Sequence, residues 1–180
     1  MAMMSVSNIW NTEPMFQYNW HIYIVPPTAV SKWQDSLTYR AKTVNIPDRS
    51  FDEVEIPWRR SKVKVLGRDS SPKSFDITGW LDVDLTLFQF MNDWQDLVSH
   101  QDTGLGVYKV DYTAQITVVQ VNNNDEIVTD YTFYNVMPQS RQAMSLDYAS
   151  SEAVDLSITF IYDKMLASPQ TKSTTQNFGE

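Results

Sequence analysis

The sequence has no cysteine and only two histidines, His21 and His100, among its 180 residues. The lack of cysteine excludes disulfide bonds and cysteine-based zinc sites, and it is compatible with folding in a reducing cytoplasm. No stretch approaches the roughly 20 consecutive apolar residues that a transmembrane helix needs. The first residues also lack the basic segment and the apolar core of a signal peptide. We therefore expect a chain that does not insert into a membrane.

Catalytic signatures are equally scarce. The chain contains no nucleophile elbow of the G-x-S-x-G type, no Walker motif and no glycine-rich dinucleotide motif. Asp82 and Asp84 supply too few oxygen ligands for a calcium site. A neighbouring acid pair such as Asp93 and Asp96 is expected by chance in a region this acidic. We expect a protein that is not an enzyme and that uses no metal and no cofactor.

Basic residues are outnumbered, and they are unevenly placed. The net charge of -8 argues against a protein that binds nucleic acid by neutralising phosphates. Residues 1–73 carry ten Lys and Arg against seven Asp and Glu, whereas residues 74–163 carry two against fourteen. Two interpretations fit this polarity. In the first, the uneven charge reflects only which faces of the protein are solvated. In the second, the basic and acidic surfaces of successive copies meet head to tail.

The chain does have enough apolar and aromatic residues for one globular domain. Hydrophobic residues make up 42% of the sequence and aromatic residues 13%, and a chain of this length buries roughly 70% of its surface on folding. Residues 15–165 are predicted to form this domain. Residues 1–14 are predicted to be an N-terminal arm, because polar residues and Pro14 break any period, and residues 166–180 a polar C-terminal tail.

Two segments, residues 111–118 and 154–162, alternate apolar and polar side chains with strict period two. This alternation is typical of antiparallel strands that bury one face and leave the other in water. Thr113, Gln115 and Thr117 form the polar face of the first segment. Further strands are predicted at residues 15–25, 38–46, 60–65, 74–80 and 127–137. The sequence therefore indicates a mainly β, antiparallel fold.

Helical spacing occurs clearly in one segment, residues 84–98. Leu87, Met91, Trp94 and Val98 recur at the spacing of one helix face, which predicts a helix lying over a sheet. Asp84 or Thr86 is expected to cap its first turn. Residues 28–37 are expected to be an irregular connection, with at most a helical turn.

Residues 47–58 combine acids, two prolines and large apolar side chains. A long extension of this kind is more often an interaction surface than a linker, although its apolar residues can also fold back on their own domain. The next segment, residues 60–65, places Arg60, Lys62 and Lys64 on one strand face, and residues 67–73 are predicted to be a loop. Residues 122–125 are predicted to turn the chain. The following strand is apolar on both faces, as in a central or interface strand.

Several strings, in this order and spacing, resemble the tail tube proteins of phages with contractile tails, which are relatives of the tube subunits of type VI secretion systems and R-type pyocins. The match runs over roughly residues 15–165 and leaves out the two ends of the chain. The matching strings are Phe16-Gln17-Tyr18-Asn19-Trp20, Tyr39-Arg40-Ala41-Lys42 leading to Ile46-Pro47, the stretch 54–60, Ser74-Phe75-Asp76-Ile77-Thr78, Phe133-Tyr134-Asn135-Val136-Met137-Pro138, Met144-Ser145-Leu146-Asp147-Tyr148 and Ile158-Thr159-Phe160-Ile161-Tyr162-Asp163.

The resemblance implies two packed antiparallel sheets, a β-sandwich or partial barrel, with one flanking helix. It implies that six copies form a ring, that their strands join into a continuous barrel, and that rings stack into a tube. The tube would carry tape-measure protein during assembly and DNA during ejection, without binding the DNA specifically. Its partners would be the sheath, the baseplate hub and the tail terminator, in the virion after assembly in the host cytoplasm.

Particular residues follow from the resemblance and from the patterns above. The loop at about residues 48–59 is expected to reach the neighbouring ring through Phe51, Val54, Ile56, Trp58 and Arg59. The lumen candidates are Thr113, Gln115, Thr117, Arg40, Lys42, Lys62 and Lys64. The candidates for the seam between subunits are Tyr131, Phe133 and Tyr134. A tube of a type VI secretion system or R-type pyocin is the alternative, and a carbohydrate-binding β-sandwich is a third class that would need an exposed aromatic platform.

Overall fold

The computed structural model describes residues 16–59, 61–142, 144, 148 and 153–169. The predicted arm at residues 1–14 and most of the predicted tail lie outside these residues. Within them the chain is mainly β and antiparallel, which confirms the prediction from period-two segments. Four helical segments accompany the strands, so the expectation of a single flanking helix is wrong.

The elements follow one another as β1 (Trp20–Val25), η1 (Thr28–Trp33), α2 (Gln34–Arg40), β2 (Ala41–Val44), β3 (Phe51–Trp58), β4 (Ser61–Asp69), β5 (Ser74–Trp80), α3 (Thr86–Val98), α4 (Lys109–Tyr112), β6 (Ala114–Val121), β7 (Ile127–Arg141), β8 (Asp155–Ile161) and β9 (Lys164–Pro169). Seven strands form one sheet in the order β1-β6-β7-β8-β5-β2, with β9 also paired to β7. Strands β3 and β4 form a separate two-stranded sheet. No closed barrel forms within the described residues.

Strand β7 joins the two halves of the large sheet. Its first part pairs with β6 and β9, and its last part, from Met137, pairs with β8. Asn135, at φ 53°, is left-handed close to this change of partner. The two halves pack against each other, because the ring of Phe133 on β7 stacks on Phe75 of β5 at 4.3 Å. The doubly apolar strand predicted from the sequence is thus a central strand.

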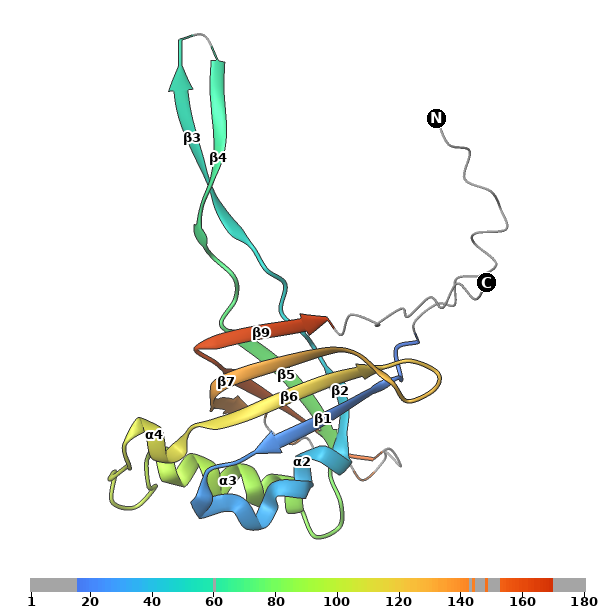
Figure 1. Ribbon diagram of the computed structural model, residues 1–180. Coiled ribbons are helices and arrows are strands. Elements are labelled where there is room, and N and C mark those ends of the chain that lie inside the picture. The colour runs from blue at the N-terminus through green and yellow to red at the C-terminus, as the bar shows by residue number, and fades with distance from the viewer. Residues whose placement is uncertain (1–15, 60, 143, 145–147, 149–152, 170–180) are drawn as a thin grey trace, which may run out of the picture.

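Helix α3 closes the core, as its spacing predicts. Leu87, Phe90, Met91 and Trp94 are all fully buried, and the Trp94 ring lies 5.7 Å from that of Phe160 on β8. The expected caps are wrong. Asp82 takes that role, since its Oδ1 accepts the Thr86 N–H at 2.8 Å. Helices α2, α3 and α4 gather at one end of the molecule (Figure 1).

Three predicted strand starts are wrong, and two of them are helical. Helix α2 occupies residues 34–40 and leaves only Ala41–Val44 for β2, because Leu37 turns into the core at helical spacing from Val30. Helix α4 replaces the start of the strand predicted at 111–118, where the Tyr112 carbonyl accepts a 2.6 Å hydrogen bond from Trp94 Nε1. Strand β1 begins at Trp20 rather than at residue 15.

Candidate assembly interface

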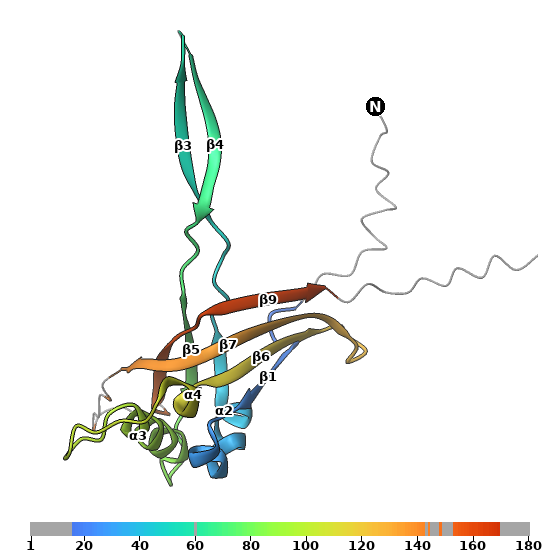
Figure 2. The ribbon, with the colours of Figure 1, turned by 60° about the vertical axis from the view of Figure 1, so that its left-hand side comes forward.

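A β-hairpin formed by β3 and β4 projects far from the large sheet (Figures 1 and 2). The sequence predicted a long extension at residues 47–58 and a loop from Gly67. The structure places strand β3 in the extension and corrects the start of the loop, because β4 continues to Asp69. Every described residue of the two strands is exposed. Pro57 is tolerated because a two-stranded ribbon has only edge strands.

A group of serines ties together the two segments of chain at the base of the hairpin. Ser70 donates its N–H to the Ser50 carbonyl at 3.0 Å, and the Ser50 N–H donates to Ser71 Oγ at 3.0 Å. Just below them, Tyr162 Oη donates to the Pro72 carbonyl at 2.7 Å. The serines therefore hold the two segments to each other, and Tyr162 joins the segment after β4 to the core. Among the described residues, the outer part of the hairpin forms strand pairs only with itself.

One face of the hairpin is charged and internally neutralised. Lys62 pairs with Glu55 and Lys64 with Glu53, each at 2.5 Å. Both pairs are diagonal in the β3–β4 register, because Lys62 lies opposite Pro57 and Lys64 lies opposite Glu55. This arrangement accounts for the shared face predicted for Lys62 and Lys64, and it leaves neither cation in the large sheet.

The other face of the hairpin is apolar. Val54 lies opposite Val65, and Ile56 lies opposite Val63. Trp58, two residues after Ile56, lies on the same face. We call these five residues the apolar stripe. All of them are exposed, Trp58 by 63%. Sequence reasoning identified the β3 half and missed Val63 and Val65, although their alternation with Lys62 and Lys64 was a usable signal.

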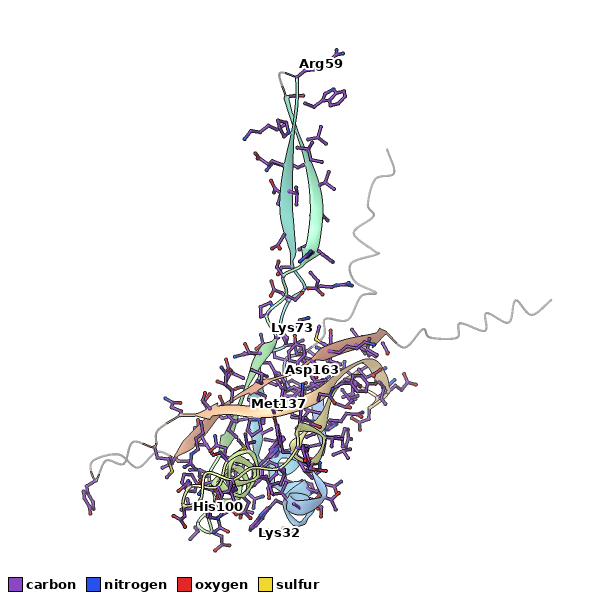
Figure 3. The ribbon with its side chains drawn as sticks, turned by 90° about the vertical axis from the view of Figure 1, so that its left-hand side faces the viewer. Lys32, Arg59, Lys73, His100, Met137 and Asp163 are labelled. Carbon is purple, nitrogen blue, oxygen red and sulfur yellow. The ribbon has the colours of Figure 1, made fainter. Side chains whose placement is uncertain are left out.

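The remaining two predicted inter-ring residues lie at the two ends of β3. Phe51, near the base, is exposed and lies under the Arg49 guanidinium at 5.0 Å. Arg59 is at the far end, with φ 54° in the turn. Figure 3 shows Arg59 at the tip and His100 at the opposite end of the molecule. All five residues predicted for this contact thus belong to one projecting element.

Among the described residues, the first half of the large sheet has two free edges. Its strands run in the order β1-β6-β7-β9, and each neighbouring pair is antiparallel. Strand β1 at one edge and strand β9 at the other therefore run in opposite directions. Strand β9, residues 164–169, continues the sheet, so residues 166–169 of the predicted tail belong to a strand.

The side of these four strands that faces away from the core carries few charges. Its residues pair across the strands as Tyr23 with Thr117, Thr117 with Thr132, and Thr132 with Leu166. Following the same register, this outer face consists of His21, Tyr23, Val25, Gln115, Thr117, Val119, Asp130, Thr132, Tyr134, Lys164, Leu166 and Ser168. Asp130 and Lys164 offset each other, so the face is close to neutral.

The structure does not bring the seven lumen candidates together. Gln115 and Thr117 lie on the outer face, and Thr113 precedes β6. Lys62 and Lys64 lie on the projecting hairpin. Arg40 ends α2 and Lys42 lies on β2, at the other end of the large sheet from β1. The mixed, partly basic lining expected from this set is therefore not present on any one face of the chain.

Arg40 and Lys42 are held in ion pairs of the chain itself. Arg40 donates to Asp82 Oδ2 at 2.6 Å, with both side chains largely buried, and Lys42 pairs with Asp155 at 2.5 Å. The hydroxyl of Thr86 and then the Arg40 guanidinium stabilise the Asp82 carboxylate and lower its pKa to about 2. This pair fixes the start of α3 to the end of α2.

The seam candidates separate in the same way. Phe133 is 0% exposed in the chain's own core, so its side chain has no surface left for a neighbouring subunit. Tyr131 is half-buried and packs against that core. Tyr134 is exposed on the outer face, opposite Lys164.

One further feature of the surface is a groove with an aromatic lining. A groove of about 1040 Å³ opens between β1 and β2 and is lined by aromatic residues that include Phe16, Tyr18, Trp20 and Tyr39. In the described part of the chain, no group of three or more His, Asp or Glu is arranged to hold a metal ion. No helix found there is both long and apolar enough to cross a membrane.

The fold is similar to that of several solved structures. A chain of the sheath/tube terminator of an extracellular contractile injection system, PVC, has a TM-score of 0.61 at 18% identity, covering 88% of this chain and 99% of that one. A chain of the PVC sheath–tube complex has 0.60 at 17% identity, covering 92% and 98%. A chain of the anti-feeding prophage tube-terminating cap has 0.61 at 17% identity, covering 88% and 93%.

Sequence comparison is more restrictive. No curated protein sequence matches this chain significantly. The family model for phage tail tube proteins matches residues 15–168, which is most of the chain and nearly the whole described fold. The matched range includes the hairpin, the four-stranded sheet with its free edges, and β9 almost to its end. The chain belongs to the phage tail tube protein family.

Proposed function

We propose that this chain is the structural subunit of a phage tail tube. Six copies form a ring, rings stack into a tube, and the tube conducts tape-measure protein and genomic DNA. The observation that carries the proposal is the hairpin, which holds an apolar stripe in water away from its own core. An exposed apolar surface of this kind is characteristic of an interaction site.

The two free edges of the four-stranded sheet support ring formation. Joining β9 of one copy to β1 of the next continues the antiparallel alternation without a break, because these edges run in opposite directions. Repetition around a symmetry axis then closes the strands into one barrel and removes the edges, which otherwise invite uncontrolled pairing. In this arrangement the outer face of the four strands becomes the wall of the lumen.

The outer face suits a conduit. It combines tyrosine and aliphatic side chains with short hydroxyl and amide groups, and its one acid and one base per copy give phosphates little to bind. Gln115 and Thr117 keep the lumen role that was expected of them, whereas the four cations are removed from it. The lining is near neutral, not acidic as a simple repulsion argument for DNA passage predicts.

The stacked contact is head to tail, so it generates an open tube whose length another component must limit. The resemblance to tail tube proteins implies the partners, which are a tape-measure protein, a tail terminator, a baseplate hub and the surrounding sheath, in the phage particle after assembly in the host cytoplasm. The role is structural and not enzymatic. It requires no cofactor.

Electron microscopy of the purified chain tests the proposal. We expect rings or tubes about 100 Å across, from six domains of this size around a pore, with sixfold symmetry in end views. Rings that never stack at high concentration indicate a terminator instead of a tube subunit. A strictly monomeric protein at high concentration contradicts both.

A tube of a type VI secretion system, R-type pyocin or related injection system is the second candidate, because the solved structures of similar fold come from contractile injection systems. The two candidates share one geometry and differ in cargo. Intact particles purified with their tube separate them. Nuclease-protected genomic DNA supports the phage tail, and protein cargo without DNA supports the injection system.

A further inference from the structure

The end of the molecule opposite the hairpin tip carries a second unpartnered surface. We call residues 99–112, which run from the end of α3 through α4, the distal loop. Leu105, Val107, Tyr108 and Val110 are exposed there, Tyr108 by 84% and Val110 by 78%. Figure 1 shows α4 at the end where the helices gather, away from the hairpin. Four exposed apolar residues within six positions are too many to be incidental surface.

The distal loop is held in place from within the chain. His100 donates its N–H to the Leu105 carbonyl at 2.9 Å, and Val107 donates to the Leu97 carbonyl at 3.1 Å. A Cβ on Gly106 would lie only 2.2 Å from the Val98 carbonyl oxygen, so only glycine permits this close return to α3. A surface already ordered in this way pays little conformational entropy on binding.

The charges of the two ends are complementary. Arg59 at the hairpin tip forms no ion pair with any residue that the structure describes. Asp102 and Asp111 of the distal loop are also without ion pairs in the same part of the chain, and both are exposed. The cation–acid match sets the direction of approach, while the apolar surfaces supply the affinity.

We propose that the distal loop of one copy is the surface that receives the hairpin of a copy in the next ring. The apolar stripe covers Leu105, Tyr108 and Val110, and Arg59 meets Asp102 and Asp111. This inference rests on the proposed function, and it adds the identity of the receiving surface. The contact is heterologous, because each copy offers a hairpin at one end and a loop at the other.

Engineered disulfides test the contact without background, because the chain has no cysteine of its own. The double variant Trp58→Cys with Tyr108→Cys is assembled, oxidised and run on a non-reducing gel. Each copy then has one cysteine at each end, so we expect a ladder of linked chains. The matched control is Trp58→Cys with Tyr39→Cys, which places the second cysteine in the groove between β1 and β2.

The outcomes separate the inference from the proposed function. A ladder from the Tyr108 variant and none from the Tyr39 variant supports the distal loop. A ladder only from the Tyr39 variant shows that the groove receives the hairpin and overturns the inference. Tubes that assemble without any ladder also overturn it but leave the proposed function standing. If the unmodified chain forms no ring or tube, the proposed function itself fails.

A charge exchange gives a second readout. Arg59→Glu should raise the critical concentration for stacking, by roughly 1.5- to 5-fold for each lost contact at an exposed ion pair. Adding Asp111→Arg to the same chain recreates an opposite pair across the contact and should restore stacking in part. Restoration by Asp111→Arg but not by Asp35→Arg, an acid outside the distal loop, supports the pairing. Equal restoration of stacking by Asp111→Arg and Asp35→Arg would contradict the pairing of Arg59 with Asp111.

Discussion

Asn135 donates a hydrogen bond from Nδ2 to Asp163 Oδ2 at 2.9 Å, across 28 residues of sequence. Asn135 is the left-handed residue near the point where β7 leaves β9 for β8, and Asp163 lies in the turn that connects β8 to β9. Lys109 pairs with the same carboxylate at 2.7 Å. Asn135, Asp163 and Lys109 thus stabilise the region where the two halves of the large sheet separate. Lys109 first and Asn135 second keep the pKa of Asp163 below its usual range.

Replacing Asn135 separates its two roles. Asn135→Gly loses only the hydrogen bond, because glycine adopts a left-handed backbone without a steric penalty. Asn135→Ala loses the hydrogen bond and also places a Cβ on the left-handed backbone. We expect Asn135→Ala to be the less stable variant by about 1 kcal/mol, the cost of a left-handed alanine. Urea unfolding of both variants measures the difference. Equal stabilities would show that the φ of 53° carries no strain for alanine.

Asp82 should make the fold sensitive to acid. Its pKa of about 2 is below the ordinary 3.8, so the folded state favours the ionised form. The resulting stabilisation is complete above about pH 4 and is lost as the pH falls toward 2. Asp82→Asn should lower stability at pH 7 and flatten the stability curve between pH 4 and 2. Denaturation at a series of pH values checks this, and parallel curves for the two proteins would refute it.

The apolar stripe should matter for assembly and not for folding. Ile56→Asp combined with Trp58→Ala is expected to abolish stacking and to change the unfolding free energy by no more than about 0.5 kcal/mol, as at other surface sites. Leu66→Asp is the matched control, because Leu66 lies opposite Glu53 on the charged face of the same hairpin. Light scattering reports stacking and circular dichroism the fold. Unfolding of the double variant would mean that the stripe belongs to the core.

Trp94 should support the distal loop as well as the core. Trp94→Phe keeps an aromatic ring near Phe90 and Phe160 but loses the hydrogen bond to the Tyr112 carbonyl. We expect a loss of about 1–3 kcal/mol for the unpaired carbonyl, against about 3–5 kcal/mol for Trp94→Ala. Hydrogen exchange should show faster exchange around α4 in Trp94→Phe. Unchanged exchange there would contradict an anchoring role.

The elements that could be predicted are those in which one face is buried by neighbours of the same domain. Strand β5 matches its prediction at both ends, and β8 falls inside its predicted segment. Helical spacing correctly identifies Leu87, Met91 and Trp94 as buried in α3, but not Val98, which is 37% exposed at the end of the helix. In each of these elements, burial of one face makes apolar residues recur with the period of the strand or helix, and this period can be recognised in the sequence. The exposed side chains of the hairpin were recognisable for the opposite reason, since large apolar residues stood among acids.

The errors have local causes. Thr38 and Tyr39 have no strong preference against a strand, and only the packing of Leu37 makes them helical. Lys109–Tyr112 continues an apparent alternation that the Trp94 hydrogen bond interrupts. The lumen candidates do not share one face of the chain, because alternation within one strand does not predict which faces of distant strands lie side by side. The order in which strands pair decides which faces lie side by side, and the alternation of residue types within a strand does not reveal that order.

The separation of the hairpin from the core has a kinetic consequence. A two-stranded ribbon with no third strand is marginally stable in water, so docking onto another copy must also keep it ordered. Ordering the hairpins on docking costs conformational entropy. The first contact between two free rings orders them with few contacts in return, whereas a ring that joins an existing end meets a complete circle of receiving surfaces. Growth should therefore show a lag phase, and a preformed ring should act as its seed.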